Sequence, residues 1–198
     1  MGRIVVTEFS SLDGVVEAPG GEDFKYPNWS FAFDRGTEGD RFKLDEALGA
    51  EALLIGRRTY EGFAAAWPRY EGELADKYNA MPKYVVSRTL TDPAWNNTHV
   101  LAGDLADDVT RLRHEVTGDI SVAGSIRLVQ GLIEHDLVDE LHLMTFPVLL
   151  GTGRRLFGAT PDKQAWKLTE SASVGEGVLI TVFQRVRDAD REATRSQE

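Results

Sequence analysis

Short apolar segments alternate with helical segments along most of this 198-residue chain. The segments with the length and β-branched composition of strands are residues 4–9, 52–55, 84–87, 98–101, 119–123 and 140–146. The segments with the three- and four-residue apolar spacing of a buried helix face are residues 40–48, 60–67, 105–116 and 126–133. Because strands that alternate with helices form parallel sheets, we predict an α/β fold whose mainly parallel sheet is covered on both faces.

The C-terminal part of the chain has a different pattern. Residues 166–174 and 178–186 alternate apolar and polar side chains on either side of Gly175-Glu176-Gly177. This alternation around a glycine-containing turn is typical of a hairpin, so we expect an antiparallel pair at one edge of the sheet. We expect residues 1–186 to form a single domain and the polar residues 187–198 to be a disordered tail.

Composition excludes several classes of function. The formal net charge of −10 opposes binding to nucleic acid or to an anionic membrane, because both need clustered Lys and Arg. The absence of cysteine excludes disulfides, a catalytic thiolate and cysteine-ligated metal sites. None of the histidines has the spacing of a metal motif, so we expect no metal. Since no segment resembles a signal peptide or has membrane-spanning length, we expect a cytoplasmic protein.

Gly56 ends a predicted strand and is followed by Arg57, Arg58 and Thr59, where a helix is expected to start. A helix N-terminus presents unpaired backbone N–H groups and the positive end of the helix dipole, so it attracts anions. Arginine donates in a fork that suits phosphate, and the threonine hydroxyl either caps the helix or binds a phosphate oxygen. The alternative is that both arginines only solvate the helix start.

A second junction of this kind follows residue 123, where Gly124-Ser125 opens a helix. The strand that ends at Ser87-Arg88 adds a third candidate site. In open α/β sheets, ligands bind beyond the carboxyl ends of the strands, where these three sites are expected to meet. We therefore predict that the chain binds one extended ligand that carries phosphate groups.

Aromatic residues gather in two places. The irregular segment 17–39 contains Phe24, Tyr26, Trp29, Phe31 and Phe33. A long loop of this composition forms either a lid over a site or a surface buried against a partner subunit. On the helix after Gly56, the residues Tyr60, Phe63 and Trp67 share one face, and such a stripe more often faces the core than a ligand.

Four motifs, in this order and spacing, resemble those of one enzyme family. Gly56-Arg-Arg-Thr-Tyr-Glu-Gly-Phe63 resembles the cofactor-binding segment of dihydrofolate reductases, and Ser10-Ser-Leu-Asp-Gly14 resembles the first-strand motif of the riboflavin-biosynthesis reductase domain. Val122-Ala-Gly-Ser-Ile126 is similar to the double-glycine pyrophosphate turn, and residues 139–153 resemble the late strand and loop of the reductase domain. Across residues 3–186, the chain looks like a stand-alone relative of the deaminase-reductase C-terminal domain, which implies a dihydrofolate reductase-like three-layer fold.

The resemblance implies an oxidoreductase that uses NADPH. Next to Gly56, the residues that would hold the adenosine 2′-phosphate and the neighbouring phosphate are Arg57, Arg58, Thr59, Ser87 and Arg88. The pyrophosphate would lie on the backbone of Ala123, Gly124, Ser125 and Ile126, with Ala123 in place of the family's first glycine. The nicotinamide end would contact Phe9, Gly14 and Val16. The arginines favour NADPH over NADH, because a guanidinium group forms strong bidentate hydrogen bonds with a dianionic phosphate.

On the substrate side, the resemblance implies that Phe63 and Trp67 shape a pocket for a planar heterocycle and that Trp29 and Phe31 cover it. In the family, a hydride passes from the nicotinamide to a C=N or C=O carbon while an acid or water supplies a proton. No carboxylate aligns with that of dihydrofolate reductases, so the catalytic residue is unknown. The candidates are Asp34 and Asp13. For Asp13, the alternative to a catalytic role is that it stabilises the turn.

Two functions remain open from the sequence. The arginines and the pocket aromatics favour an NADPH-dependent reductase of a small heterocyclic or sugar-derived substrate, such as 5-amino-6-(5-phosphoribosylamino)uracil in riboflavin biosynthesis. The missing carboxylate favours a non-catalytic nucleotide-binding or regulatory protein that retains the fold. The resemblance also implies a homodimer.

Overall fold

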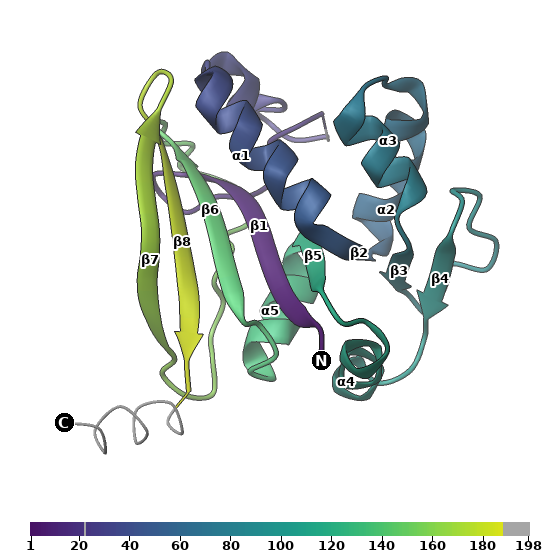
Figure 1. Cartoon of the computed structure of the whole chain (residues 1–198). Coiled ribbons are helices and arrows are strands. Elements are labelled where there is room, and N and C mark those ends of the chain that lie inside the picture. The colour runs from purple at the N-terminus through teal and green to yellow at the C-terminus, as the bar shows by residue number, and fades with distance from the viewer. Residues whose placement is uncertain (22, 188–198) are drawn as a thin grey trace.

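The computed structural model describes residues 1–21 and 23–187. The strands of this part form one eight-stranded sheet in the order β4-β3-β2-β5-β1-β6-β8-β7 (Figure 1). The strands are β1 (Arg3–Ser11), β2 (Ala50–Gly56), β3 (Lys83–Val86), β4 (Thr98–Leu101), β5 (Asp119–Ala123), β6 (Glu140–Phe146), β7 (Ala165–Val174) and β8 (Val178–Val186). The α-helices are α1 (Gly36–Gly49), α2 (Arg57–Ala66), α3 (Glu73–Ala80), α4 (Leu105–Glu115) and α5 (Ile126–Glu134). Short 3₁₀ turns, η1 and η2, span Trp29–Ala32 and Trp67–Arg69.

The sheet is parallel from β4 through β6 and changes direction at β8. The central strand β1 pairs in parallel with β5 on one side and with β6 on the other. Beyond β5, the strands β2, β3 and β4 continue the parallel part. β8 runs antiparallel to both β6 and β7. The predicted parallel sheet with a C-terminal antiparallel hairpin is therefore confirmed.

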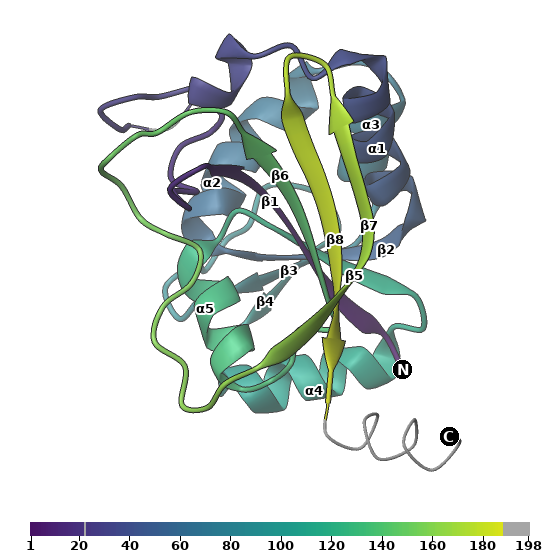
Figure 2. The same cartoon turned by 90° about the vertical axis from the view of Figure 1, so that its left-hand side faces the viewer.

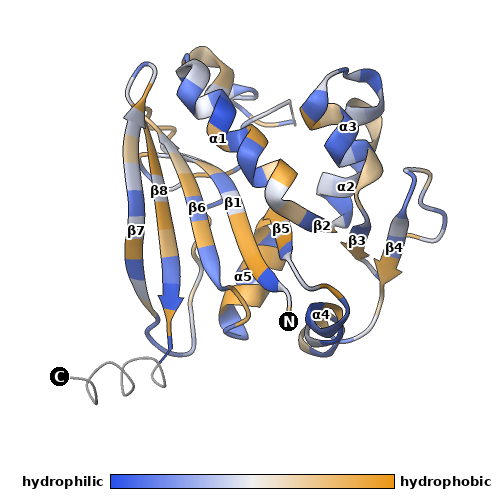
Figure 3. Cartoon of the chain, viewed as in Figure 1, coloured by the Kyte–Doolittle hydropathy of each residue, from blue (hydrophilic) through white to orange (hydrophobic). Residues whose placement is uncertain are grey.

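Helices cover both faces of the sheet, with α1, α2 and α3 on one face and α4 and α5 on the other (Figures 1 and 2). In the main apolar cluster, Val109 of α4 and Val129 and Leu132 of α5 pack against Ile4 and Val6 of β1. A second cluster joins α2 and α3 to β2 and β3, and a third lies between β6, β8 and the aromatic loop. The hydropathy colouring shows the apolar central strands and α5 (Figure 3). Burial of these apolar side chains is the main force that holds the layers together.

Two helix boundaries differ from the sequence interpretation. α3 lies in a segment for which we predict no helix from the sequence, because the buried face of this helix consists of Ala75 and Tyr78 and is too narrow to recognise by spacing. α1 begins at Gly36 rather than near residue 40, at a point where Asp34 Oδ1 accepts the N–H of Gly36 at 2.7 Å.

The start of α4 is as predicted. Asp104 Oδ1 accepts the backbone N–H groups of Ala106 and Asp107 at 2.9 and 3.2 Å. The prediction of a tail at 187–198 falls, apart from Arg187, outside the described residues. In residues 1–21 and 23–187, no helix is long and apolar enough to cross a membrane.

Candidate functional site

The two strand–glycine–helix junctions predicted from the sequence lie against each other at the carboxyl ends of β2 and β5. The N–H of Gly56 donates to Ser125 Oγ at 2.9 Å, and the N–H of Ser125 donates to Thr59 Oγ1 at 3.0 Å. Ser125 Oγ in turn donates to the carbonyl of Ala123 at 3.2 Å. These bonds join the starts of α2 and α5 into one unit, so a ligand held by one helix start is within reach of the other.

Glycine is required at position 124 of this unit. Gly124 has φ +56°, and a Cβ there would lie 3.1 Å from Thr59 Oγ1. Ser125, with φ 60°, also has a left-handed backbone conformation, so the chain turns sharply before α5 and exposes its first N–H groups. Ala123 lies within β5 and does not have a positive φ, so alanine is accommodated where the resembling motif has its first glycine.

The starts of α2 and α5 differ from those of the other α-helices in the described residues. α1, α3 and α4 each have an acidic side chain in the first turn, whereas α2 and α5 have none. As at the starts of α1 and α3, no side-chain capping bond is made at the Gly56 or Ser125 N-cap, so a cap does not replace the missing acid. The positive end of the helix dipole is therefore left uncompensated at these two helix starts, which is the arrangement that binds an anion.

Exposed arginines surround the two helix starts. Arg57 and Arg58 lie in the first turn of α2, and Arg88 follows β3, the neighbour of β2. Arg57 Nη1 lies 3.0 Å from Glu61 Oε1, in a half-exposed ion pair that contributes little to stability and can give way to a phosphate. Arg127 in the first turn of α5 was not predicted. The signal for Arg127 was its position two residues after Ser125, which places it at the start of the helix.

Ser87 has a role inside its own turn. Its Oγ accepts the N–H groups of Thr89 and Leu90 at 3.2 and 3.0 Å, and the residue is 9% exposed. The Ser87 hydroxyl therefore shapes the turn that carries Arg88.

The turn after β1 is bonded to the loop after β6 through Asp13. Its carboxylate accepts the Ser11 hydroxyl at 2.7 Å and the N–H groups of Leu150 and Gly151 at 3.2 and 2.9 Å. The Ser11 hydroxyl and these N–H groups lower the pKa of Asp13 to about 2, so at neutral pH the carboxylate has no proton to donate. The structure thus gives Asp13 the turn-stabilising role that was its alternative.

The two other predicted residues of this turn differ in exposure. A Cβ at Gly14, where φ is +77°, would meet no atom within 4 Å, so the space beside this glycine is open. Val16 is buried, and its N–H donates to the Arg154 carbonyl at 3.0 Å. The turn can therefore approach a ligand closely at Gly14, while Val16 supports it from the core.

Phe9 lies on β1 beneath the start of α1. Its ring contacts Phe146 edge-on with centroids 5.2 Å apart, and the cationic groups of Arg35 and Lys43 lie 5.4 and 5.3 Å from its centroid. The face of the Phe9 ring attracts these two cations, so it stabilises positive charge beside this part of β1.

The aromatic loop packs on the protein's own sheet. Trp29 is 6% exposed, donates from Nε1 to the Glu17 carbonyl at 2.8 Å and contacts Phe146 edge-on. Phe31 is 70% exposed, and Asp34 is exposed with its carboxylate bonded to Gly36. Of the predicted cover residues, Phe31 is therefore the one whose ring is available to a ligand.

Phe63 and Trp67 face α3. Trp67 stacks on Tyr78 with centroids 4.4 Å apart, and Phe63 contacts both rings edge-on. All three belong to the apolar cluster of α2, α3, β2 and β3. The aromatic stripe on α2 thus packs in the core, as its spacing alone favoured, and does not lie beside Phe9, which belongs to the third cluster.

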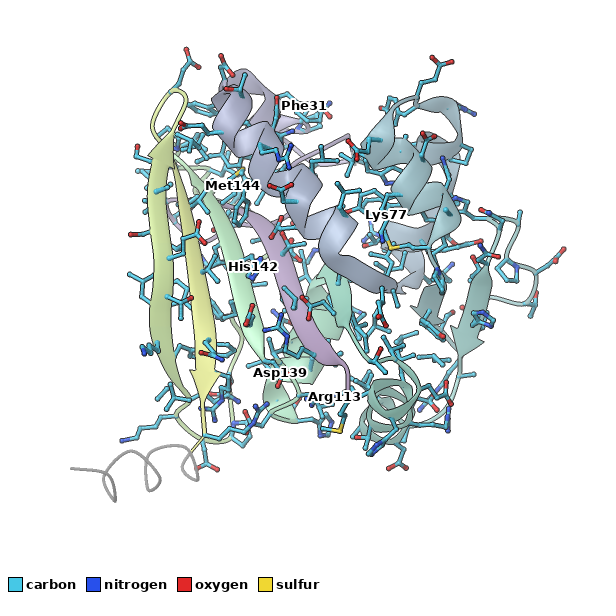
Figure 4. The ribbon with its side chains drawn as sticks, viewed as in Figure 1. Phe31, Lys77, Arg113, Asp139, His142 and Met144 are labelled. Atoms are coloured by element: carbon cyan, nitrogen blue, oxygen red, sulfur yellow. The ribbon has the colours of Figure 1, made fainter. Side chains whose placement is uncertain are left out.

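A buried polar cluster that the sequence analysis did not identify connects α1 to β1 and β6. Glu46 accepts from Lys43 Nζ at 2.6 Å, from His142 Nδ1 at 2.7 Å and from Thr7 Oγ1 at 3.1 Å. The Glu46 side chain is 8% exposed, and those of Lys43 and His142 are 16% and 15% exposed. Figure 4 shows His142 on β6 beside α1. Glu46 is therefore the centre of the cluster.

The charges of this cluster stabilise one another. Burial would raise the pKa of Glu46, but Lys43 and His142 hold that pKa below its usual value. Burial would likewise lower the pKa of His142, but the carboxylates of Glu46 and Glu140 raise it above its usual value. Near neutral pH the cluster therefore contains an ionised Glu46 beside a His142 that readily holds a proton.

An open cavity of about 380 Å³ adjoins the cluster along the amino-terminal halves of β1, β5 and β6. Its polar lining includes Arg3, Thr7, Glu46, Asp119, Glu140 and His142. This cavity lies at the opposite ends of the strands from Gly56 and Gly124. Lys43 lies over the Phe9 ring, and His142 lines the cavity. The cluster therefore lies between Phe9 and the cavity, and its His142 can hold a proton there.

In the described residues 1–21 and 23–187, no group of three or more His, Asp or Glu side chains is arranged to hold a metal ion.

Comparison with known proteins identifies relatives of this chain. Residues 3–180 match the family model of the RibD C-terminal domain. The uncharacterised protein YyaP of Bacillus subtilis (strain 168) is 26% identical over 186 residues, which cover 91% of this chain and 94% of YyaP.

Solved structures share the fold. A candidate riboflavin biosynthesis protein from Shewanella sp. PV-4 superposes with a TM-score of 0.74 at 21% identity, covering 93% of this chain and 99% of its own. A pyrimidine reductase-like protein from Corynebacterium diphtheriae superposes with a TM-score of 0.65 at 13% identity, covering 94% of this chain and 93% of its own. At these identities the likeness concerns the fold, and it confirms the three-layer architecture implied by the resemblance.

Proposed function

Since this chain belongs to the RibD C-terminal domain family, we propose that it is an NADPH-dependent reductase that acts on a small heterocyclic or sugar-derived substrate. The family consists in general of reductases, and the sites described above support binding of a dinucleotide phosphate.

The observation that carries the proposal is the hydrogen-bonded pair of uncompensated helix starts. A dinucleotide has phosphates at two or three points along its length, so it needs anion sites that lie side by side. The start of α5 after Gly124 would hold the pyrophosphate through backbone N–H groups. The start of α2 after Gly56 would hold the phosphate of the adenosine ribose, with Thr59 and Ser125 fixing the two relative to each other.

NADPH is proposed rather than NADH because of the charge at the α2 start. Arg57, Arg58 and Arg88 are exposed cations, and no acidic side chain lies in the first turn to oppose an added phosphate. An acid near a ribose 2′-hydroxyl is the usual mark of NAD binding, whereas arginine accommodates a 2′-phosphate. The adenosine 2′-phosphate would therefore lie among these guanidinium groups.

Bound NADPH would supply the hydride for reduction of a C=N or C=O carbon. The open space at Gly14 would admit the nicotinamide beside Phe9. Lys43, which lies 2.6 Å from Glu46 and over the Phe9 ring, would face that side of the site. Relatives of the fold include a pyrimidine reductase-like protein and a candidate riboflavin biosynthesis protein, which supports a pyrimidine such as 5-amino-6-(5-phosphoribosylamino)uracil as the first substrate to test.

The second function is a nucleotide-binding or regulatory protein without catalysis. It is favoured by the structural engagement of Asp13 and Asp34, because both carboxylates accept backbone N–H groups that shape the chain around them. This protein would bind NADPH but would not oxidise it with any pyrimidine.

The proposal is tested by titrating NADPH and NADH into the protein and its variants while tryptophan fluorescence is followed. Arg58→Ala should weaken NADPH binding about 10- to 100-fold, as loss of one charge-assisted contact does, and should leave NADH binding almost unchanged. Arg41→Ala, on the exposed face of α1, is the matched control and should change neither. Equal binding of the two nucleotides, or an equal loss in both variants, would refute the proposed 2′-phosphate site.

A further inference from the structure

One buried cluster of titratable side chains lies next to the place proposed for the nicotinamide. Phe9 and Met144 are paired neighbours on β1 and β6, and Thr7 and His142 form the preceding pair on the same face of these strands. Residues two apart along a strand are separated by about 7 Å. The cluster centred on Glu46 therefore lies one such step from Phe9, toward the amino-terminal ends of the strands and on the side of the sheet that α1 crosses (Figure 4).

Hydrogen bonds and ion pairs connect the members of this cluster in a row. Glu140 Oε2 lies 3.1 Å from His142 Nε2, and Glu46 Oε1 lies 2.7 Å from His142 Nδ1. Glu46 Oε2 lies 2.6 Å from Lys43 Nζ, which also donates to Thr7 Oγ1. Carboxylates, imidazole and ammonium can each take up or release a proton, so the row provides a path for protons between Glu140 and Lys43.

The two ends of the row have different surroundings. Glu140 and His142 line the open cavity at the amino-terminal halves of β1, β5 and β6, where water has access. At the other end, Lys43 Nζ lies 5.3 Å from the centroid of the Phe9 ring. The row thus connects solvent with the side of the site at which the nicotinamide is proposed to lie.

Charged groups of several elements surround His142. They contact the imidazole or line the cavity beside it: Asp45 and Glu46 of α1, Arg3 of β1, Asp119 of β5, Glu140 of β6 and Glu170 of β7. Arg3 pairs with Asp119 at 2.8 Å and with Glu140 at 2.7 Å. Burial alone would lower the pKa of His142, but Glu46 and Glu140 raise it above its usual value, so the imidazole is a store for a proton that solvent in the cavity can refill.

Reduction of a C=N or C=O bond needs a proton as well as a hydride. Asp13 and Asp34 accept backbone N–H groups and shape the chain around them. Arg35 lies near the Phe9 ring, but a guanidinium group does not release its proton in proteins. These three residues therefore leave the source of the proton unassigned.

Lys43 has a donor to spare beside Phe9. Its Nζ has three N–H donors, and the contacts with Glu46 and Thr7 use two of them, which leaves one for a ligand. A buried ion pair is seldom worth more to stability than an apolar contact of the same size, so charges kept inside a protein beside a cleft often mark a functional site.

We propose that Lys43 supplies the proton of the reduction, and that Glu46 and His142 position it and restore its proton from the cavity. This inference rests on the proposed reductase function. When the carbon of a C=N group accepts the hydride, the π bond breaks and the nitrogen takes a proton from Lys43 Nζ, while NADPH is oxidised to NADP⁺. The neutral Lys43 amine then regains a proton from His142 through Glu46, and His142 takes one from the solvent in the cavity. With a C=O group, the oxygen takes the proton.

Nuclear magnetic resonance of the four histidines tests the proposal without a substrate. The Cε1–H signal of each histidine is followed against pH while the protein is saturated with NADPH and then with NADP⁺, whose nicotinamide is positively charged. This charge should lower the titration midpoint of His142 by about 0.5 pH unit or more, as a unit charge about 10 Å away does at an effective dielectric constant of about 40. His99, which stacks on Tyr84 at the other end of the sheet, is the internal control and should not respond.

Lys43→Arg distinguishes a proton donor from a fixed charge. Arginine keeps the positive charge beside Glu46 but does not release a proton. The variant should bind NADPH as the wild type does, whereas its turnover of 5-amino-6-(5-phosphoribosylamino)uracil should fall at least about 100-fold. Lys77→Arg, at a lysine of α3 whose ammonium donates to the Leu48 carbonyl, is the matched control and should keep full turnover.

Two results would overturn the proposal: equal His142 midpoints in the two nucleotide complexes, or full turnover by Lys43→Arg. If the protein binds both nucleotides and His142 does not respond, this inference fails and the cofactor site stands. If the protein binds neither nucleotide, the reductase function fails and this inference fails with it. The His142 comparison uses the wild-type protein, so it decides the matter if circular dichroism shows Lys43→Arg to be unfolded or if the pyrimidine is not turned over.

Discussion

Replacing Glu46 by Gln should destabilise the protein by more than any surface ion pair can account for. Glu46 accepts hydrogen bonds from Lys43, His142 and Thr7 at 2.6, 2.7 and 3.1 Å, and its side chain is 8% exposed. Glutamine has nearly the same shape as glutamate but lacks the negative charge that pairs with both Lys43 and His142. Breaking a buried pair in this way costs about 3–5 kcal/mol, so we expect a loss of about 3 kcal/mol and a fall in Tm of roughly 10 °C.

The loss should depend on pH in a defined direction. The pKa of His142 is raised in the folded protein, so its contribution to stability is fully present below 6.5 and is lost as the pH rises through the raised value. The pKa of Glu46 is lowered, so its contribution is present above 4.5 and is lost as the pH falls through the lowered value. The difference between wild type and Glu46→Gln should therefore be largest between pH 4.5 and 6.5.

Urea unfolding followed by circular dichroism at pH 5.5, 7 and 9 measures this difference. Glu61→Gln is the matched control, because Glu61 also pairs with a cation but is half-exposed, and it should change stability by less than about 1 kcal/mol. If Glu46→Gln were as mild as Glu61→Gln, or if its effect grew steadily up to pH 9, the assigned roles of Glu46 and His142 would be wrong.

Two further substitutions have expected outcomes. Asp104→Ala removes the side chain that accepts two N–H groups at the start of α4, so it should cost about 1 kcal/mol in urea unfolding and leave NADPH binding unchanged. Gly124→Ala forces a Cβ into a left-handed backbone 3.1 Å from Thr59 Oγ1. It should lower stability by at least about 1 kcal/mol and weaken NADPH binding, as measured by thermal unfolding and titration; a stable variant with full binding would contradict the role of Gly124.

The strands and most helices could be predicted because their signals are local. β5 and β6 span the residues expected from their apolar runs, and α4 starts directly after its N-cap residue Asp104. The hairpin of β7 and β8 follows from alternation around two glycines. By contrast, α3 has only a narrow buried face, so its pattern does not differ from that of a polar loop.

The proximity of the two phosphate junctions could be inferred from strand order, but the bonds between them could not. Thr59 and Ser125 are 66 residues apart in sequence, and their hydrogen bond depends on how β2 pairs with β5. The sequence also could not decide whether Phe63 and Trp67 face a ligand or the core, because the answer depends on Tyr78 of the unpredicted α3.

The polar cluster was missed for a related reason. Lys43 and Glu46 are three residues apart on a helix, a spacing that usually marks an exposed ion pair. Their burial follows from His142, which lies 96 residues beyond Glu46 in sequence. Lys83 is a further case: it is 0% exposed, and its ammonium donates to the carbonyls of Asn79, Met81 and Asn96, which no pattern in the sequence connects to it.

The central claim is that the starts of α2 and α5 form one site for the phosphates of NADPH. Nuclear magnetic resonance of the ¹⁵N-labelled protein during an NADPH titration tests it most directly, because each backbone amide is observed separately. The amide signals of residues 56–60 and 124–128 should shift together, with one common affinity, while those of residues 105–108 at the capped start of α4 should not. Shifts at only one of the two helix starts, or at neither, would contradict the claim.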